Sequence, residues 1–176
     1  NHILDYDIKG LEDTLDICDK LGIFYYGAGT KEEAAKPYFV QLNGIKIGIL
    51  AFAEQEFNCA VDYGKGANLW DDLDGIKSIK LAKQECDYLI VQYHGGIEHY
   101  EYPSPDLQKR CRFMCEAGAD FVTCQHSHCI GTRENYNGAE ILYGQGNSIF
   151  GYREKNNSWN QGLIAKIEIS DTVKIT

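Results

Sequence analysis

Two apolar segments that each begin with an aspartate and end at histidine constrain the fold of this chain more than any other feature. The first is DYLIVQYH, which ends at His94, and the second is DFVTCQHSH, which ends at His126 and His128. Their length and their β-branched and aromatic content predict buried strands. Because ligands in α/β proteins gather at strand ends, we expect the three imidazoles to meet at one edge of a sheet. His126 and His128, separated by one residue, can face one metal ion or two.

Each of the two strands follows a segment with helical periodicity. Helices are predicted over residues 76–86 and 107–117, and Ser104 or Asp106 is expected to cap the second. A helix and a strand that occur twice in succession indicate βαβ connectivity with parallel strands. The chain is therefore expected to form a single α/β domain over residues 1–176.

Shorter signals mark the remaining elements. An amphipathic helix is predicted over Asp7–Leu21, and Asn-Gly pairs at 43–44 and 137–138 predict two hairpins. A short strand is expected over Ile23–Tyr26, and residues 54–74 are interpreted as a long loop near the site. The alternation over 163–169 predicts a last strand, paired with 173–176.

The charge and the cysteines narrow the class of protein. A net charge of −9 argues against a nucleic-acid-binding or anionic membrane surface, and a polyanionic substrate would need a bound cation. The seven cysteines contain no Cys-x-x-Cys pair, so core packing is favoured over a zinc–thiolate site or a disulfide framework. Reduced cysteines favour a cytoplasmic setting.

Four short motifs occur in an order that resembles a known family. They are Asn1-His2-x-x-Asp5, His94-Gly95-Gly96-x-Glu98, His126-x-His128 and Gly146-Asn147-Ser148-Ile149-Phe150. Together they resemble the CapA-type capsule and poly-γ-glutamate biosynthesis proteins of the calcineurin-like metallophosphoesterase superfamily. The resemblance covers essentially the whole chain and favours association with a membrane. From the residues alone, Asn147 is interpreted as a turn residue that satisfies backbone groups.

The resemblance implies a fold, a cofactor and a set of roles. The fold would be a four-layer αββα sandwich whose N-terminal part is missing from this chain, with two divalent ions (Mn, Fe or Zn) in the full-length protein. Asn1, His94 and His126 would hold one ion and His128 the other. His2 would act as general acid or charge stabiliser, and Glu98 would bind substrate or orient a ligand.

The activity implied by the resemblance is hydrolysis by a metal-activated water. The substrate would be an anionic polymer or a phosphoester, with capsule or polyglutamate synthesis proteins as partners. Two departures from the family pattern stand out: Cys124-Gln125 occupies positions where relatives often have Gly-His, and Asp7 replaces a common glycine. Aspartate tolerates the left-handed backbone conformation better than most residues, so the second departure is expected to be tolerated.

Two other functions remain open at this point. Gln125 and the missing upstream ligands suggest a non-catalytic scaffold or polymer-binding subunit of an export complex. A small zinc protein in which His94, His126 and His128 have a folding role is the third candidate.

Overall fold

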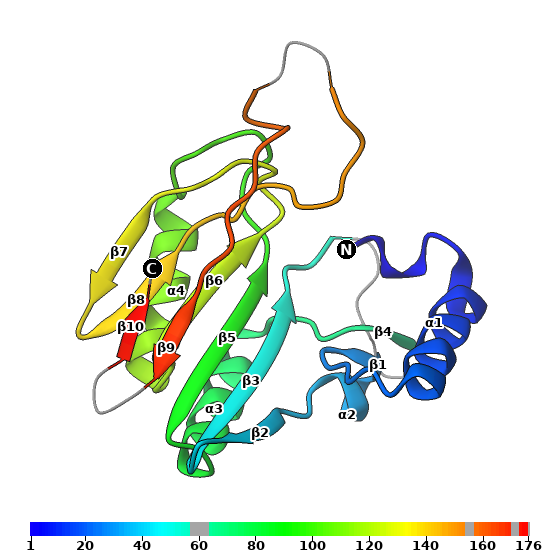
Figure 1. Ribbon diagram of the computed structural model, residues 1–176, viewed down its shortest axis with the longest axis horizontal. Helices are drawn as coiled ribbons and strands as arrows, with labels where there is room; N and C mark the ends of the chain where they lie inside the picture. The colour runs from blue at the N-terminus through cyan, green and yellow to red at the C-terminus, as the bar shows by residue number, and fades with distance from the viewer. Residues whose placement is uncertain (57–63, 154–156, 170–172, 176) are drawn as a thin grey trace.

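The computed structural model describes residues 1–56, 64–153, 157–169 and 173–175, and a six-stranded sheet forms its centre (Figure 1). The strand order is β2–β3–β5–β6–β8–β7. The four inner strands are parallel, and the edge strands β2 and β7 run antiparallel to their neighbours. The bounds of the six strands are Tyr38–Leu42 (β2), Ile45–Ala53 (β3), Tyr88–His94 (β5), Phe121–Gln125 (β6), Arg133–Tyr136 (β7) and Ala139–Leu142 (β8).

Two helices cover one face of the sheet. They are α3 (Asp72–Gln84) and α4 (Pro105–Ala117), and each connects two parallel strands. The expected βαβ connectivity is therefore confirmed, because β3 pairs with β5 and β5 with β6 in parallel register. Ser104 caps α4 by accepting a hydrogen bond from the Leu107 amide. The main hydrophobic core lies between these helices and the sheet.

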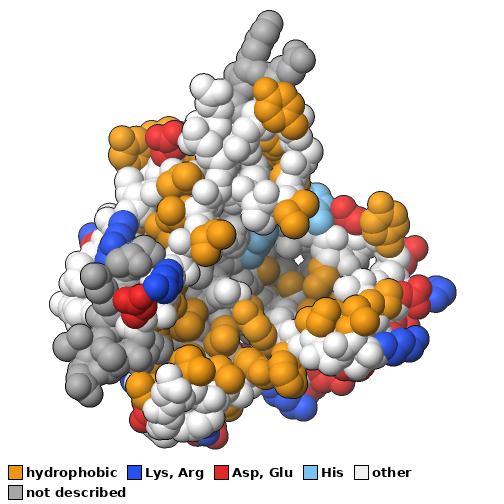
Figure 2. Space-filling view, in the orientation of Figure 1, with side chains coloured by type: hydrophobic (Ala, Val, Ile, Leu, Met, Phe, Trp, Pro, Cys, Tyr) orange, Lys and Arg blue, Asp and Glu red, His pale blue; other side chains and the backbone are white. Residues whose placement is uncertain are grey.

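The opposite face of the sheet is only partly covered. The antiparallel pair β9 (Ile167–Ile169) and β10 (Val173–Ile175) lies on this side (Figure 1). A smaller cluster of Tyr88, Phe121 and Leu142 packs there against the segment that leads into β9. Over β3 and β5, the half-buried side chains of this face include the apolar Ile49, Ala51 and Ile90 and the polar Gln92. Figure 2 shows hydrophobic side chains gathered on this face.

The N-terminal part of the chain forms a small layer to one side of β3 (Figure 1). It contains a 3₁₀ turn (His2–Leu4), α1 (Asp7–Leu21), α2 (Lys31–Ala34) and the short antiparallel pair of β1 (Ala28–Thr30) with β4 (Lys65–Ala67). The bounds of α1 are those predicted. Asp7 has a φ of 62°, so aspartate here adopts the backbone conformation for which a glycine is common.

Several predicted elements are confirmed and others are corrected. Both Asn-Gly hairpins form, as β2–β3 and β7–β8. The strand expected over Ile23–Tyr26 is wrong, because these residues have no strand partner and the chain first pairs at Ala28. Only 167–169 of the expected 163–169 strand is β-structure, and the expected 54–74 loop contains β4 and the start of α3. Residues 57–63 of that loop, and the predicted turn at 170–171, lie outside the described residues.

The architecture is α/β, with one mixed sheet and helices on one of its faces. Within the described ranges, a second large sheet of the kind that a four-layer sandwich requires is not present. Among the same residues, none of the helices has the length and apolar character needed to cross a membrane.

Asp120 ties α3 to the start of the two central strands, and its removal gives a test of this packing. Its Oδ2 accepts hydrogen bonds from the Leu89 amide at 2.7 Å and from Lys83 Nζ at 2.6 Å. We expect Asp120→Ala to lower the free energy of unfolding by about 1–3 kcal/mol, because the Leu89 amide loses its acceptor. Urea denaturation measures the effect. Asp13→Ala removes only an exposed ion pair with Lys9 and should change the free energy of unfolding little. Equal losses of stability in the two variants would contradict the role of Asp120 in this packing.

Candidate metal centre

The carboxyl ends of three parallel strands bring a group of polar side chains to one edge of the sheet. Glu54 follows β3, His94 is the last residue of β5, and His126 follows β6. Backbone pairing continues past the strand ends, because the Glu54 amide donates to the His94 carbonyl at 2.9 Å. The sheet register therefore places these three residues side by side, as expected for the two histidines.

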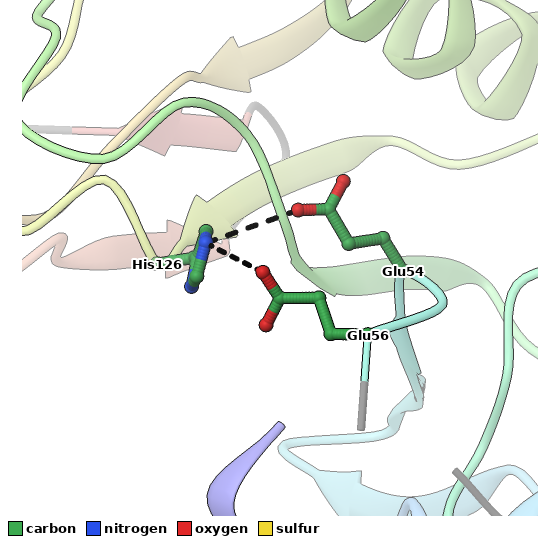
Figure 3. A group of neighbouring side chains, drawn as sticks. All are labelled: Glu54, Glu56 and His126. Carbon is green, nitrogen blue, oxygen red and sulfur yellow. Dashed lines mark ion pairs between the residues drawn. The ribbon is translucent and has the colours of Figure 1, made fainter. Parts of the chain in front are cut away.

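His126 lies at the centre of this group (Figure 3). Its side chain is 5% exposed, and its Nε2 is 3.2 Å from a Glu56 oxygen and 3.9 Å from a Glu54 oxygen. The candidate ligand atoms of the three residues all lie within 4.8 Å of one another. Ligands held at about 2.1 Å from one tetrahedral ion are about 3.4 Å apart. The spacing of Glu56 and His126 thus fits a shared ion, and the Glu54 oxygen lies just beyond that spacing.

His94 adds a neutral imidazole to the same edge. Its ring centroid is 5.2 Å from that of His126. Among the described residues, its Nε2 is the buried side-chain atom that has no hydrogen-bond partner. Burial lowers the pKa of His94 to about 4, because it disfavours the charged form of the ring. A buried, neutral ring with an unpaired nitrogen fits a metal ligand, because such atoms otherwise cost free energy.

The lowered pKa predicts a pH-dependent stability in the metal-free protein. At pH values between 6.5 and about 4, the unfolded chain binds a proton at His94 that the folded protein does not bind. The free energy of unfolding should therefore fall as the pH decreases through this window, and His94→Gln should remove this component. Urea titrations of both proteins at pH 7, 5.5 and 4.5, with chelator present, measure the difference. Parallel pH profiles for the two proteins would contradict the burial of a neutral His94.

Asn1 and His128 complete the set of expected metal ligands. The Asn1 amide nitrogen lies 3.3 Å from His126 Nδ1 and also donates a hydrogen bond to Glu56. The ring of His128 is further away, with its centroid 6.3 Å from that of His126. The structure thus brings Asn1, His94 and His126 together and places His128 beside them. Which of these residues share an ion stays a prediction.

The two residues expected to act on substrate are both exposed. Glu98 is half exposed, with one oxygen 4.0 Å from His126 Nε2. His2 is exposed and pairs through Nδ1 with an Asp5 oxygen at 2.9 Å. Both side chains are accessible to solvent, and Glu98 also lies close to His126. Their roles stay predictions.

The backbone around the histidines adopts an unusual conformation. His126 and His128 have φ angles of 101° and 55°, in the region that favours glycine. Such conformations cost free energy in residues with a side chain and tend to occur at functional sites. Both residues follow the last residue of β6, Gln125, at the carboxyl end of the strand.

Glu54 and Glu56 are the site residues that the sequence analysis missed. Both lie in the segment interpreted only as a loop near the site. The strand-end rule that singled out His94 applies equally to Glu54, because it follows directly after the apolar run of β3. Periodicity carries no comparable signal for Glu56, whose side chain reaches His126 from a non-regular segment.

Most of this chain matches a known protein family and several curated proteins. A family model described as bacterial capsule synthesis protein PGA_cap matches residues 1–152. The PGA biosynthesis protein CapA of Bacillus subtilis is 32% identical over 161 residues, which cover 85% of this chain and 40% of the relative. The capsule biosynthesis protein CapA of Bacillus anthracis is 29% identical over 157 residues, covering 85% and 38%.

A more distant relative comes from Mycobacterium tuberculosis. It is a probable polyglutamine synthesis accessory protein, 28% identical over 166 residues that cover 86% of this chain and 44% of the relative. The chain therefore spans about two fifths of the length of these curated relatives. All the site residues described above lie within the region matched by the family model.

Proposed function

Because this chain belongs to the family of bacterial capsule synthesis proteins, we propose that it is a metal-dependent, hydrolase-like protein of capsule or poly-γ-glutamate biosynthesis. The observation that carries the proposal is the cluster of Glu54, Glu56 and His126 at the strand ends, with the unpaired Nε2 of His94 beside it. Two carboxylates and two imidazoles form a donor set that suits Mn, Fe or Zn. The names of the relatives support the pathway, and the geometry supports the chemistry.

The residues of the chain divide into those that hold the ion and those that meet the substrate. Glu54, Glu56, His94 and His126 would hold a divalent ion, with Asn1 as a further ligand and His128 serving a second ion. A bound divalent ion lowers the pKa of water and stabilises negative charge that develops on the substrate. It would also offset the negative charge that Glu54 and Glu56 bring to the site.

Glu98 and His2 are positioned to act on the substrate in this proposal. The half-exposed Glu98 carboxylate lies at the rim, where it can accept a hydrogen bond from substrate or orient a ligand. Asp5 holds the His2 ring through Nδ1, so that the other ring nitrogen can supply a proton to a leaving group. The expected substrate is an anionic polymer or a phosphoester, whose charge an ion at His126 would attract.

The four-layer sandwich is part of the same proposal. The half-buried apolar side chains of β3 and β5 lie on the face opposite α3 and α4. A second sheet packed against this face would bury them, as in other proteins built from stacked sheets. Since the chain spans about two fifths of its relatives, such a sheet would come from polypeptide outside residues 1–176.

Turnover that depends on a metal tests the proposed activity. Hydrolysis of bis(p-nitrophenyl) phosphate and of a γ-glutamyl anilide is followed in the protein before and after dialysis against chelator. We expect activity that chelator removes and that Mn²⁺, Fe²⁺ or Zn²⁺ restores. Glu56→Gln should lose this activity, whereas Glu85→Gln, at an exposed helix end, should retain it.

The scaffold alternative is tested by the same turnover assays together with a measurement of polymer binding. Gln125, the residue that suggests it, donates a hydrogen bond to Gln145 at 2.6 Å in the structure. Binding of an anionic polymer that chelator does not affect, without turnover of either compound at saturating metal, would overturn the hydrolase proposal in favour of the scaffold.

A further inference from the structure

We propose that Asn147 is a positioning residue that fixes the tautomer of His128, with the proton on Nδ1 and the lone pair on Nε2. From the sequence alone, Asn147 is interpreted only as a turn residue. That the free Nε2 then serves an ion or a substrate rests on the proposed function. The tautomer itself follows from hydrogen bonds within the chain.

The orientation of the Asn147 side-chain amide is set by a carbonyl group, which can only accept hydrogen bonds. Its Nδ2 lies 2.8 Å from the carbonyl oxygen of Trp159. A carbonyl oxygen has no proton to donate, so the amide nitrogen must face Trp159. The amide oxygen therefore faces the other way, and it lies 2.8 Å from His128 Nδ1.

The orientation of the amide decides which nitrogen of His128 carries the proton. An amide oxygen only accepts hydrogen bonds, so Nδ1 must donate. A neutral imidazole has one N–H group, so Nε2 is left with its lone pair. Histidines that bind metals typically donate their second ring nitrogen to an oxygen in this way, which fixes both ring and tautomer.

Asn147 is itself held by direct pairing of two backbone segments. The backbone N–H of Asn147 donates to the Gln161 carbonyl at 2.9 Å. The backbone N–H of Leu163 donates to the Gln145 carbonyl at 2.8 Å. Gly146 and Gly162 pair between these bonds. A Cβ atom on Gly162 would collide with the Asn147 carbonyl oxygen, so the two segments pair this closely because glycine is present.

Aromatic rings restrict the remaining freedom of His128. The Trp159 ring lies at a centroid distance of 4.7 Å with 31° between the planes, and Phe150 approaches at 5.1 Å. Trp159 is 4% exposed, so it forms a fixed wall. Trp159 thus supplies both the carbonyl that orients the Asn147 amide and the ring that packs against the imidazole.

The tautomer is measurable without any activity assay. Long-range proton–nitrogen correlation spectra of protein labelled with ¹⁵N-histidine, recorded without metal at a pH where histidine is neutral, distinguish protonated from unprotonated ring nitrogens. His128→Gln identifies the signals by their loss. We expect a protonated Nδ1 and an unprotonated Nε2 in the wild type. A proton on Nε2 of His128 would overturn the proposal.

Substitutions test whether Asn147 is the cause. Asn147→Ala removes the acceptor, so the signals of His128 should shift toward the Nε2–H form, whereas Asn147→Asp keeps an acceptor and should keep the Nδ1–H form. Asn135→Ala, which removes an exposed hydrogen bond to Glu140, is the matched control and should leave the signals unchanged. An unchanged tautomer in a folded Asn147→Ala protein would overturn the proposal.

Metal affinity gives a second, separable readout. By calorimetry with Zn²⁺ or Mn²⁺, Asn147→Ala should weaken binding about 10–100-fold, and Asn147→Asp should weaken it less. A wild type with the expected tautomer that binds no metal would refute the proposed function and leave the tautomer assignment supported. A metal-binding wild type with the opposite tautomer would refute the assignment of Asn147 alone.

Discussion

Replacing His126 by alanine is expected to weaken divalent metal binding by more than about 100-fold and to abolish metal-dependent hydrolysis. The His126 ring is almost fully buried and lies within reach of Glu54, Glu56 and the Asn1 amide. Loss of supporting hydrogen bonds alone typically costs about 10–100-fold in metal affinity, so loss of the central ligand should cost more. The two glutamates would then face each other without the imidazole between them.

Calorimetric titration with Zn²⁺ or Mn²⁺, combined with the hydrolysis assay, measures this effect. His2→Ala is the informative comparison, because His2 pairs with Asp5 at the surface and is assigned to proton transfer. It should retain metal affinity while turnover falls. Unchanged metal binding and turnover in a folded His126→Ala protein would contradict the assignment of the centre.

The second large effect concerns the core that positions the centre. Leu89 lies in β5 with a relative exposure of 0%, packed in the cluster between the sheet and the two helices. We expect Leu89→Ala to lower the free energy of unfolding by about 2–5 kcal/mol, because the substitution leaves a cavity in a close-packed interior. Guanidinium denaturation followed by circular dichroism measures the loss.

The matched control is Leu42→Ala on the edge strand β2. Leu42 is 55% exposed, and such surface substitutions usually change stability by no more than about 0.5 kcal/mol. If the two variants lost similar stability, β5 would not be the central strand of the core, and the strand-end argument for His94 would lose its basis.

Elements with a local cause could be predicted from the sequence. The amphipathic pattern over Asp7–Leu21 is sufficient to define α1, and the Asn-Gly pairs define both hairpins, because a left-handed turn needs such residues. The two repeated helix–strand units also predict the parallel register of β5 and β6. That register is what brings His94 next to His126.

Features that depend on partners far away in the sequence could not be predicted. Ile23–Tyr26 has the composition of a strand, but a strand needs a neighbour, and the partner of β1 is β4 at Lys65–Ala67. Glu56 belongs to the centre only because the chain returns to it at His126. The role of Asn147 likewise depends on the Trp159 carbonyl, which the motif itself does not contain.

The most direct test of the central claim is the position of a bound ion. Anomalous diffraction at the absorption edge of Zn or Mn, from crystals of the protein grown with that metal, locates the ion without reference to activity. We expect a peak within about 2.0–2.6 Å of His126 Nε2 and of an oxygen of Glu56. A peak at cysteine sulfurs instead, or full density for the protein with no peak at saturating metal, would contradict it.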